Sequence, residues 1–378
     1  MIPDADAGLY AGIISGTSMD GIDCVVVRLH AGKVELVASK TAKYPDALRE
    51  RLFSACATPT LALLELGQLD VEVGQSFADG INQLLADSGI NPDQINAIGS
   101  HGQTLFHAPQ ATYPFSLQIG DPNTIATQTG ITVVADFRQR DMTAGGQGAP
   151  LAPLFHQHFF HKADTTRCIL NIGGISNITW LGATSEATLV GFDTGPGNVF
   201  MDMWTTQWLG HPYDRNGAWA ATGTVAEPLL QSLLQEPYFS ASPPKSTGRE
   251  LFNRAWLEQR LDNFRLTPPA DVQATLLELT ARTIADAIGQ SKPSQATDSA
   301  ELIVCGGGAH NGQLMNRLQT LLPDMSVSNT DAHGMPADWI EASTFAWLAA
   351  KTLNREKIDT KTLTGARHEV ILGGIYYA

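Results

Sequence analysis

Residues 12–23, which read GIISGTSMDGID, place glycines, hydroxyls and carboxylates between two apolar runs. The runs, residues 9–14 and 22–29, predict two strands joined by a turn. Glycine lets the backbone of a turn approach a ligand closely, while hydroxyls and carboxylates suit phosphate oxygens and a hydrated metal ion. The turn is therefore either a phosphate-binding loop or an ordinary polar hairpin, and these residues alone do not separate the two.

Two further glycine-rich sites stand at corresponding places. One combines residues 171–177 (NIGGISN) with 193–198 (DTGPGN), and the other is residues 306–311 (GGGAHN). Ligands of open α/β sheets bind where strands end at such turns. The chain has no GxxxxGK[ST] phosphate loop, and residues 306–311 lack the third glycine of the dinucleotide fingerprint, so hydride transfer from NAD is disfavoured.

The elements that must position these turns occur twice. In the first half, three strands precede alternating helices and strands, predicted at residues 9–14, 22–29, 33–44, 60–86, 95–100, 121–129 and 131–135. In the second half the same order is predicted at residues 168–172, 175–181, 187–192, 270–288, 302–305, 311–322 and 326–329. We therefore expect two α/β domains, residues 1–143 and 144–378, with an insertion near 210–265 and a C-terminal tail free to pack back on the first domain.

Composition limits the class of protein. The chain has 378 residues, 43% of them hydrophobic and 16% charged, which is typical of a globular protein of about two domains. Lysine and arginine number 24 against 38 acidic residues, a formal charge of -14, which disfavours binding to nucleic acid or to an anionic membrane. The scattered cysteines form no CxxC pair, and no apolar run approaches the roughly 18 residues of a membrane span. We expect a soluble cytoplasmic protein.

The motifs also resemble those of a known family. Duplicated three-strand subdomains with phosphate hairpins and a late GGG turn resemble the sugar kinase, Hsp70 and actin superfamily. More narrowly, the segments that resemble the anhydro-N-acetylmuramic acid kinase family are SGTSMDGID, SHGQT, DFRQRDMTAGGQGAPL, NIGGISN, FDTGPGN and GGGAHN. The resemblance implies a duplicated actin-like (ribonuclease H-like) ATPase fold with ATP in the cleft between two domains.

The activity that this resemblance implies is a coupled reaction of peptidoglycan recycling. Such kinases open the 1,6-anhydro ring of anhydro-N-acetylmuramic acid with water and pass the γ-phosphate of ATP to the released O6. The partners implied are the small amino sugar and ATP, with the chain as a homodimer. The chemistry needs a base for the water, a cation at the phosphates and donors around the sugar.

For ATP and Mg²⁺, the resemblance assigns the three glycine-rich turns. Asp20 is the expected ligand of Mg²⁺, through water. The residues expected to bind the nucleotide are Gly16, Thr17, Ser18, Met19, Asp20, Gly21, Ile22, Asp23, Gly173, Gly174, Gly306, Gly307, Gly308 and Asn311.

Two carboxylates are the candidates for catalysis. Asp193 ends a predicted strand just before a glycine-proline turn, so its side chain is expected to face the cleft as the general base; the alternative is a cap on the following helix. Glu341 lies on a predicted helix with Phe345 and Leu348 at i+4 and i+7, which places it on an apolar stripe. An unpaired buried carboxylate is costly, so Glu341 is expected to face the sugar or the water, unless it lies at the rim of the helix.

Candidates for the sugar lie in the first half. Arg138 follows the last strand of that half, where a guanidinium suits the lactyl carboxylate or the transferring phosphate. Arg140 is the alternative, and an interdomain ion pair with Asp136 or Asp141 is the structural explanation. His101 and Thr104 end a strand and are expected to contact sugar hydroxyls, unless the histidine is satisfied within the core.

A histidine cluster at residues 156–161 resembles a metal site only in composition. His158 and His161 share a helix face, but His156 does not, and leucines and phenylalanines lie beside them. Packing or a subunit contact is the favoured interpretation.

Two other functions fit parts of the pattern. An ATP switch of the actin or Hsp70 type would hydrolyse ATP slowly and act on a protein partner. A glycosidase would use Asp193 and Glu341 as its carboxylate pair, without ATP. ATP consumption with and without the sugar, together with analysis of the product for phosphate, separates the three functions.

Overall fold

The structure is a computed structural model that describes residues 7–16, 19, 21–57, 60–184, 189–243, 245–248, 250–293, 296 and 300–378. Its contacts divide the chain into two compact units. The first unit joins Met1–Phe155 to Trp339–Ala378, and the second is His156–Asp338.

The division does not fall at the boundary expected from the sequence, after residue 143. Residues 144–148 stay with the first unit because the C-terminal segment binds them there. Arg367 N donates to Ala144 O at 2.9 Å, and Gln147 N donates to Thr364 O at 2.8 Å. These bonds join residues far apart in the sequence and hold residues 144–148 in the first unit, whose first segment ends at Phe155.

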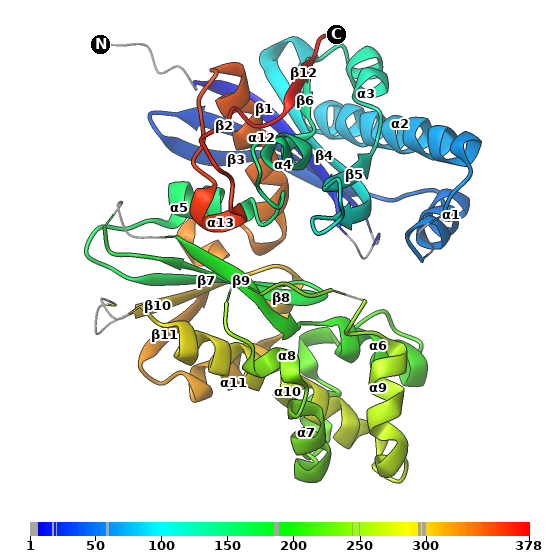
Figure 1. Ribbon diagram of the computed structural model, residues 1–378, viewed down its shortest axis with the longest axis vertical. Coiled ribbons are helices and arrows are strands. Elements are labelled where there is room, and N and C mark those ends of the chain that lie inside the picture. The colour runs from blue at the N-terminus through cyan, green and yellow to red at the C-terminus, as the bar shows by residue number, and fades with distance from the viewer. Residues whose placement is uncertain are drawn as a thin grey trace. The chain divides into compact units, whose positions relative to one another are not determined.

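The sheet of the first unit has the strand order β12-β6-β4-β1-β2-β3, with β5 paired to the far half of β4 (Figure 1). Strands β1 to β3 are antiparallel, whereas β4 runs parallel to both β1 and β6. The strands are β1 (Gly8–Ser15), β2 (Ile22–His30), β3 (Lys33–Ala42), β4 (Ile95–Ala108), β5 (Phe115–Ile119), β6 (Val133–Ala135) and β12 (Gly374–Tyr376). The helices are α1 (Asp46–Ala57), α2 (Leu63–Ser88), α3 (Pro122–Thr129), α4 (Phe137–Thr143), α12 (Ile340–Leu353) and α13 (Lys361–Thr364), and α5 (Ala152–Phe160) spans the division between units.

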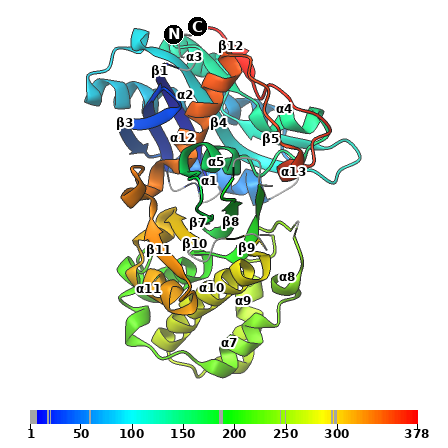
Figure 2. The same cartoon turned by 90° about the vertical axis from the view of Figure 1, so that its left-hand side faces the viewer.

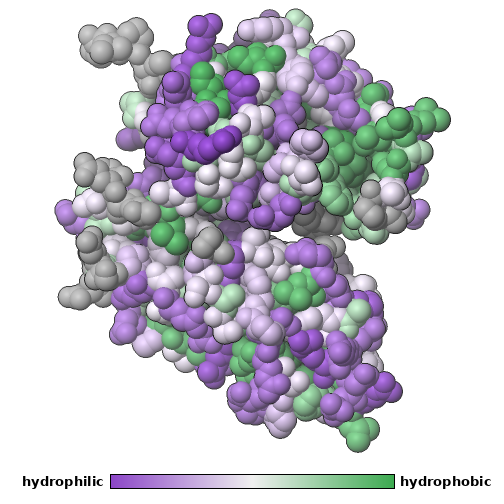
Figure 3. All heavy atoms as spheres, viewed as in Figure 1, coloured by the Kyte–Doolittle hydropathy of each residue, from purple (hydrophilic) through white to green (hydrophobic). Residues whose placement is uncertain are grey.

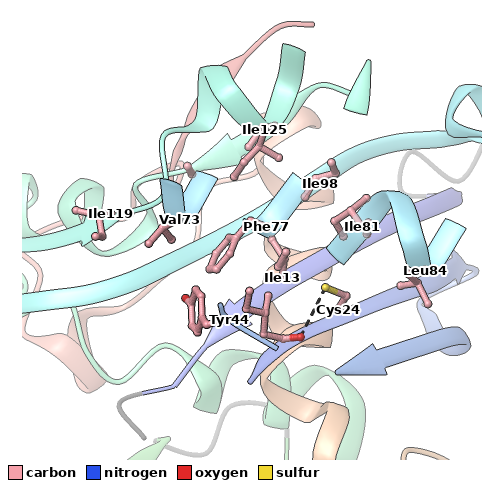
Figure 4. Close-up of a cluster of buried hydrophobic side chains, with 14 of the residues drawn as sticks. Ile13, Cys24, Tyr44, Val73, Phe77, Ile81, Leu84, Ile98, Ile119 and Ile125 are labelled. Carbon is pink, nitrogen blue, oxygen red and sulfur yellow. Dashed lines mark hydrogen bonds between the residues drawn. The ribbon is translucent and has the colours of Figure 1, made fainter. Parts of the chain in front are cut away.

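Side chains alternate between the two faces of this sheet. On one face, Ile13 and Ile98 pack against Phe77 and Ile81 of α2, whose apolar residues recur at the helical spacing predicted from the sequence (Figure 4). On the other face, Gly12 and Gly99 lie directly beneath the backbone of α12. Glycines at these two positions allow the close approach of helix and sheet.

The second unit contains a sheet with the order β11-β10-β7-β8-β9. Its long helix α10 packs against β9, and α6, α7 and α11 pack against α10 (Figure 2). The strands are β7 (Arg167–Ile172), β8 (Ile175–Leu181), β9 (Val190–Pro196), β10 (Ala300–Cys305) and β11 (Met325–Asn329). The helices are α6 (Val199–Leu209), α7 (Glu227–Leu234), α8 (Pro237–Ser240), α9 (Arg254–Leu261), α10 (Pro269–Ser291) and α11 (Gly312–Leu321).

The two sheets share one plan. In each, three antiparallel strands (β1–β3 and β7–β9) are followed by a strand that pairs in parallel with the first of the three (β4 with β1, β10 with β7). A further parallel strand then lies beyond it (β6 and β11). The predicted duplication of an α/β unit is thus confirmed, and the fold is the duplicated actin-like one.

Two strands are longer than the sequence suggested. β4 continues past Ser100 to Ala108, because β5 pairs with its second half. β9 continues to Pro196, because Gly195 and Pro196 still pair with β8. His101, Thr104 and Asp193 therefore lie inside strands rather than at the strand ends where they were expected.

Among the described residues, no helix combines the length and the apolar content that a membrane crossing requires.

Candidate functional site

Glycine-rich turns converge at one end of the second unit's sheet. The β7–β8 turn, Gly173–Gly174, accepts hydrogen bonds from the turn after β9: Asn198 N donates to Gly173 O at 2.8 Å and Gly197 N to Gly174 O at 2.9 Å. A β-carbon on Gly197 would come within 2.3 Å of Gly173 O. Only glycine permits this approach, so the two turns form one surface.

The third turn, Gly306–Gly308, joins the same surface. Gly306 has φ +76°, and a β-carbon there would meet Asn171 Oδ1 at 2.3 Å; one on Gly308 would meet a methyl of Ile172 at the same distance. Both glycines therefore pack on the end of β7. Gly307 is different, because a β-carbon on it would have as its near neighbour only Asn198 Nδ2, at 3.8 Å. The structure thus brings together Gly173, Gly174 and Gly306–Gly308, which were predicted to act together.

Asn311 lies just beyond this turn and caps a helix. Its Oδ1 accepts the backbone N–H of Leu314 at 3.1 Å and so caps α11. Gly312 N in turn donates to Asn216 Oδ1 at 2.8 Å. Nucleotide binding by Asn311 stays a prediction, with its amide oxygen already used.

Asp193 lies on β9, the edge strand of the second sheet, two residues before Gly195. Its Oδ2 accepts hydrogen bonds from Ser246 Oγ at 2.9 Å and from Thr247 N at 3.0 Å. It does not cap α6, since that helix begins at Val199 and its N-cap residue is Asn198. The alternative interpretation of Asp193 as a helix cap is therefore wrong.

The environment of Asp193 raises the pKa of its carboxyl. Burial raises the pKa of the Asp193 carboxyl, and the nearby charge of Glu250 raises it further. The hydrogen bonds from Thr247 and Ser246 act in the opposite direction, because they stabilise the carboxylate. A carboxylate with a raised pKa is a stronger base, which suits proton abstraction from water.

The opening turn of the first unit is described only in part. Thr17, Ser18 and Asp20 lie outside the described residues. Gly16 O accepts a backbone hydrogen bond from Met19 N, three residues on, at 3.1 Å. Gln103 Nε2 also donates to Gly16 O, at 3.4 Å. Arg49 Nε donates to Met19 O at 2.7 Å. The described residues Gly16 and Met19 thus accept hydrogen bonds from a glutamine and an arginine of the same unit.

The residues that end this turn are part of the β2 structure. Ile22 is buried in the core, so only its backbone is available to a ligand. Asp23 pairs across the sheet with Ile14, and its Oδ1 accepts from Thr41 Oγ1 at 2.8 Å. Gly21 packs on the methyl of Thr41. Nucleotide binding by Gly21, Ile22 and Asp23 stays a prediction.

His101, which is buried, and Arg138 form a hydrogen-bonded pair in the first unit. Arg138 Nε donates to His101 Nε2 at 2.8 Å, and His101 Nδ1 donates to Gly102 O at 2.9 Å. Arg138 also donates to Gly148 O at 2.9 Å. Burial and the Arg138 charge lower the pKa of His101 well below its usual range, so the imidazole is neutral. Both ring nitrogens have partners, which favours the structural explanation for His101 over contact with a sugar hydroxyl.

Arg138 differs from its alternative, Arg140, in burial. Arg140 is exposed on α4, while Arg138 is half-buried. Burial lowers the pKa of Arg138, and the charges of Glu341 and Asp141 oppose that shift. Glu341 itself is exposed in the first turn of α12, although Phe345 and Leu348 are buried as the stripe predicts. Glu341 therefore lies at the rim of the helix, where its charge acts to raise the pKa of Arg138.

Sequence reasoning missed the polar groups beside His101. Ser100 Oγ and Gln103 Oε1 are buried, and no described residue bonds to them. Thr104, which was predicted, accepts from Gln118 Nε2 at 3.0 Å. Both missed residues, Ser100 and Gln103, belong to the SHGQT segment, so the motif itself pointed to them. Which of its side chains face inward depends on the length of β4, which the sequence did not predict.

Asp141 was considered from the sequence only as an ion-pair partner for the arginines of this segment. It is fully buried, and its Oδ2 accepts from Gly148 N at 2.8 Å. Its Oδ1 accepts from Thr360 Oγ1 at 2.6 Å and Thr364 Oγ1 at 2.9 Å. This carboxylate ties the C-terminal segment to the loop that carries the Arg138 acceptor.

The histidines of α5 show no metal arrangement. His156 is buried, and its Nδ1 lies 3.0 Å from Thr179 Oγ1. Across the described residues, no group of three or more histidines, cysteines or carboxylates is placed to hold a metal. His156 serves packing, as the sequence favoured.

Comparison with known proteins gives one consistent family. The sequence matches the family model described as anhydro-N-acetylmuramic acid kinase over residues 8–378. The anhydro-N-acetylmuramic acid kinase of Shewanella amazonensis is 50% identical over 370 residues, 98% of this chain and 99% of that one. That of Photobacterium profundum is 49% identical over 372 residues, 98% of each chain. Among solved structures, the activator of the 2-hydroxyisocaproyl-CoA dehydratase from Clostridium difficile has a TM-score of 0.45 and 12% identity, covering 93% of this chain and 98% of that one.

Proposed function

The chain belongs to the anhydro-N-acetylmuramic acid kinase family, and on that premise we propose that it couples hydrolysis of a 1,6-anhydro amino sugar to phosphorylation by ATP. A water oxygen bonds to the anomeric carbon while the bond from that carbon to O6 breaks. The freed O6 takes the γ-phosphoryl group of ATP, and ADP leaves. The proton from water passes to a base. The products are N-acetylmuramic acid 6-phosphate, ADP and a proton.

Asp193 is the base in this proposal, and its environment is the observation that carries it. The carboxylate lies on a strand that leads directly into the converging glycine turns of the second unit. Its pKa is raised by burial, so it accepts a proton more readily than an exposed aspartate. Two hydrogen bonds hold it in one orientation. Such a group supports general base catalysis worth roughly 10²- to 10⁴-fold.

The glycine turns of the second unit are the proposed cradle for the ATP phosphates. A β-carbon on Gly174 would meet nothing within 4 Å, and one on Gly307 would meet only an amide nitrogen at 3.8 Å. The backbone is therefore accessible at Gly174 and Gly307. Gly197, Gly306 and Gly308 instead pack closely against residues 171–173 and so hold the three turns in contact. Mg²⁺, when bound, would neutralise phosphate charge; its proposed ligand, Asp20, lies outside the described residues.

The first unit is the proposed site of the sugar. Arg138, held by His101 and Gly148, offers a guanidinium for the lactyl carboxylate. Ser100 and Gln103 supply buried polar atoms that no described residue satisfies, and a buried polar group without a partner is costly. Hydroxyl or amide groups of a sugar would remove that cost.

Coupled turnover tests the proposal. ADP release is measured with ATP alone, and with ATP plus 1,6-anhydro-N-acetylmuramic acid, while mass spectrometry follows the sugar. We expect ADP to form only with the sugar, and one phosphate on each opened sugar. Sugar-independent ADP release would instead indicate an ATP switch, and an opened sugar without phosphate would indicate a glycosidase.

Substitution of the base gives the matched test. Asp193→Asn should reduce coupled turnover by about 10³-fold, the order expected for the loss of a general base. Calorimetry should show that ATP binding is retained. Asp262→Asn, at an exposed aspartate paired with Arg265 in the same unit, should turn over like the wild type. Normal turnover by Asp193→Asn would remove Asp193 from the mechanism.

We further propose a cytoplasmic homodimer. Three of the four cysteines, Cys24, Cys168 and Cys305, are buried and form no disulfide, which suits a reducing compartment. Leu63 and Leu64 at the start of α2 are 86% and 75% exposed, and hydrophobic side chains gather on that side of the first unit (Figure 3). Light scattering should give twice the 40.5 kDa chain mass, and Leu64→Ser should weaken the association.

A further inference from the structure

The edge strand of the second sheet is covered by a segment of the insertion. Asp193 N donates to Lys245 O at 3.3 Å, and Tyr238 Oη donates to Asp193 O at 2.7 Å. Both backbone groups of Asp193 are thus bonded by the insertion, in the way that proteins protect an exposed strand edge. The insertion, whose role the sequence left unassigned, is in contact with the proposed base.

The same segment holds the Asp193 side chain. Ser246 Oγ and Thr247 N both donate to Oδ2, at 2.9 and 3.0 Å. Because both described donors reach one oxygen, they fix the plane of the carboxylate and leave the proton-accepting role to Oδ1. We propose that Ser246 and Thr247 are positioning residues that orient the Asp193 carboxylate for base catalysis. The inference rests on the proposed function.

The segment has its own anchor, independent of the carboxylate. Lys245 Nζ donates to the carbonyl oxygens of Tyr238 at 3.2 Å and Phe239 at 3.3 Å. The ammonium also lies 4.8 Å from the ring centroid of Tyr238 and 5.8 Å from that of Phe192. Removing one donor to Asp193 therefore leaves the position of the segment supported.

Groups around the carboxylate act on its proton affinity in opposite directions. The Ser246 and Thr247 hydrogen bonds lower the pKa of Asp193, whereas burial and the Glu250 charge raise it. The Lys245 ammonium is directed to carbonyl oxygens, and the Tyr238 hydroxyl is bonded to the Asp193 carbonyl. Ser246 and Glu250 therefore offer two substitutions with opposite expected effects.

The test is the pH dependence of kcat/KM for the anhydro sugar, which reports the free enzyme. Activity requires the deprotonated base, so kcat/KM falls as the pH is lowered, and this fall is the acid limb of the profile. Ser246→Ala removes a donor that stabilises the Asp193 carboxylate and should move the acid limb to higher pH by about half to one unit. Glu250→Gln removes a like charge and should move it down by a few tenths of a unit, on the order of an exposed charge pair. Ser246→Thr, which retains the hydroxyl, should restore the wild-type limb.

Controls separate positioning from folding. Ser240→Ala changes an exposed serine of the same insertion that bonds only to Pro237 O among the described residues, and it should leave the profile unchanged. Thermal unfolding of each variant should stay within a few degrees of the wild type. Unmoved limbs in both Ser246→Ala and Glu250→Gln, or limbs that move in the same direction, would overturn the inference.

Failure of the proposed function is distinguishable from failure of this inference. A wild type without sugar-dependent turnover would defeat the function itself, and an active Asp193→Asn variant would defeat the assignment of Asp193 as the base. An active wild type, an inactive Asp193→Asn variant and unmoved limbs would defeat only the positioning role of Ser246 and Thr247.

Discussion

Gly99 of β4 lies so close to α12 that a β-carbon on it would come within 1.9 Å of the Phe345 carbonyl oxygen. A backbone oxygen cannot move aside as a flexible side chain can. Gly99→Ala should therefore lower the free energy of unfolding by about 3 kcal/mol, as overpacking in a core does. Urea denaturation followed by circular dichroism measures the change.

Gly67 of α2 gives the matched control within the same unit. A β-carbon there would meet nothing within 4 Å, so Gly67→Ala should be neutral or stabilise by up to about 1 kcal/mol, through better helix propensity. Equal free energies of unfolding for Gly99→Ala and Gly67→Ala would contradict the close packing of α12 on the sheet at Gly99.

Asp141 should be the most sensitive carboxylate of the first unit. It accepts hydrogen bonds from Gly148, Thr360 and Thr364, so Asp141→Ala should cost about 3 kcal/mol by leaving buried donors unpaired. Asp141→Asn should cost about 1 kcal/mol, since an amide can still accept from Gly148 and donate to a threonine hydroxyl. Denaturation curves give both values, and an equal loss for the two variants would show that the hydrogen bonds are not the cause.

His156 should make the second unit acid-sensitive. Burial lowers the pKa of His156 to about 3, while the unfolded state titrates near 6.5. The unfolded chain therefore takes the proton first as pH falls, so the stability contributed by the neutral histidine is complete above pH 6.5 and declines below it. At pH 5 the loss is about 2 kcal/mol.

A non-titrating replacement checks this sign. His156→Gln should flatten the dependence of the free energy of unfolding between pH 7 and pH 5, whatever its effect at pH 7. His211→Gln, at an exposed histidine of the same unit, should keep the wild-type slope. A slope unaffected by His156→Gln would mean that the buried imidazole is not the acid-sensitive group.

Local sequence patterns predicted much of the fold. The spacing of Leu69, Val73 and Phe77 predicted α2, and the glycine pair at 173–174 predicted the β7–β8 turn, because both depend on neighbours in the chain. The convergence of Gly173–Gly174 with Gly306–Gly308 followed from the repeat. These features need no knowledge of distant contacts.

Features that depend on distant pairing were not predicted. Asp193 was expected before a turn, but β9 extends because its partner β8 continues beside it. The bond from Ser246 to Asp193 joins residues 53 apart through an irregular segment that has no periodic signal. The position of Glu341 at an exposed helix start likewise depended on where α12 begins.

The first unit is interrupted in the chain by the second, since Trp339–Ala378 returns to it. This arrangement sets an order of events during synthesis. Residues 156–338 are contiguous and leave the ribosome before α12, the helix that covers Gly12 and Gly99, has been made. The first segment of the first unit is therefore made well before the helix that covers one face of its sheet, and a nascent chain stalled before residue 339 would leave that face exposed and prone to aggregation.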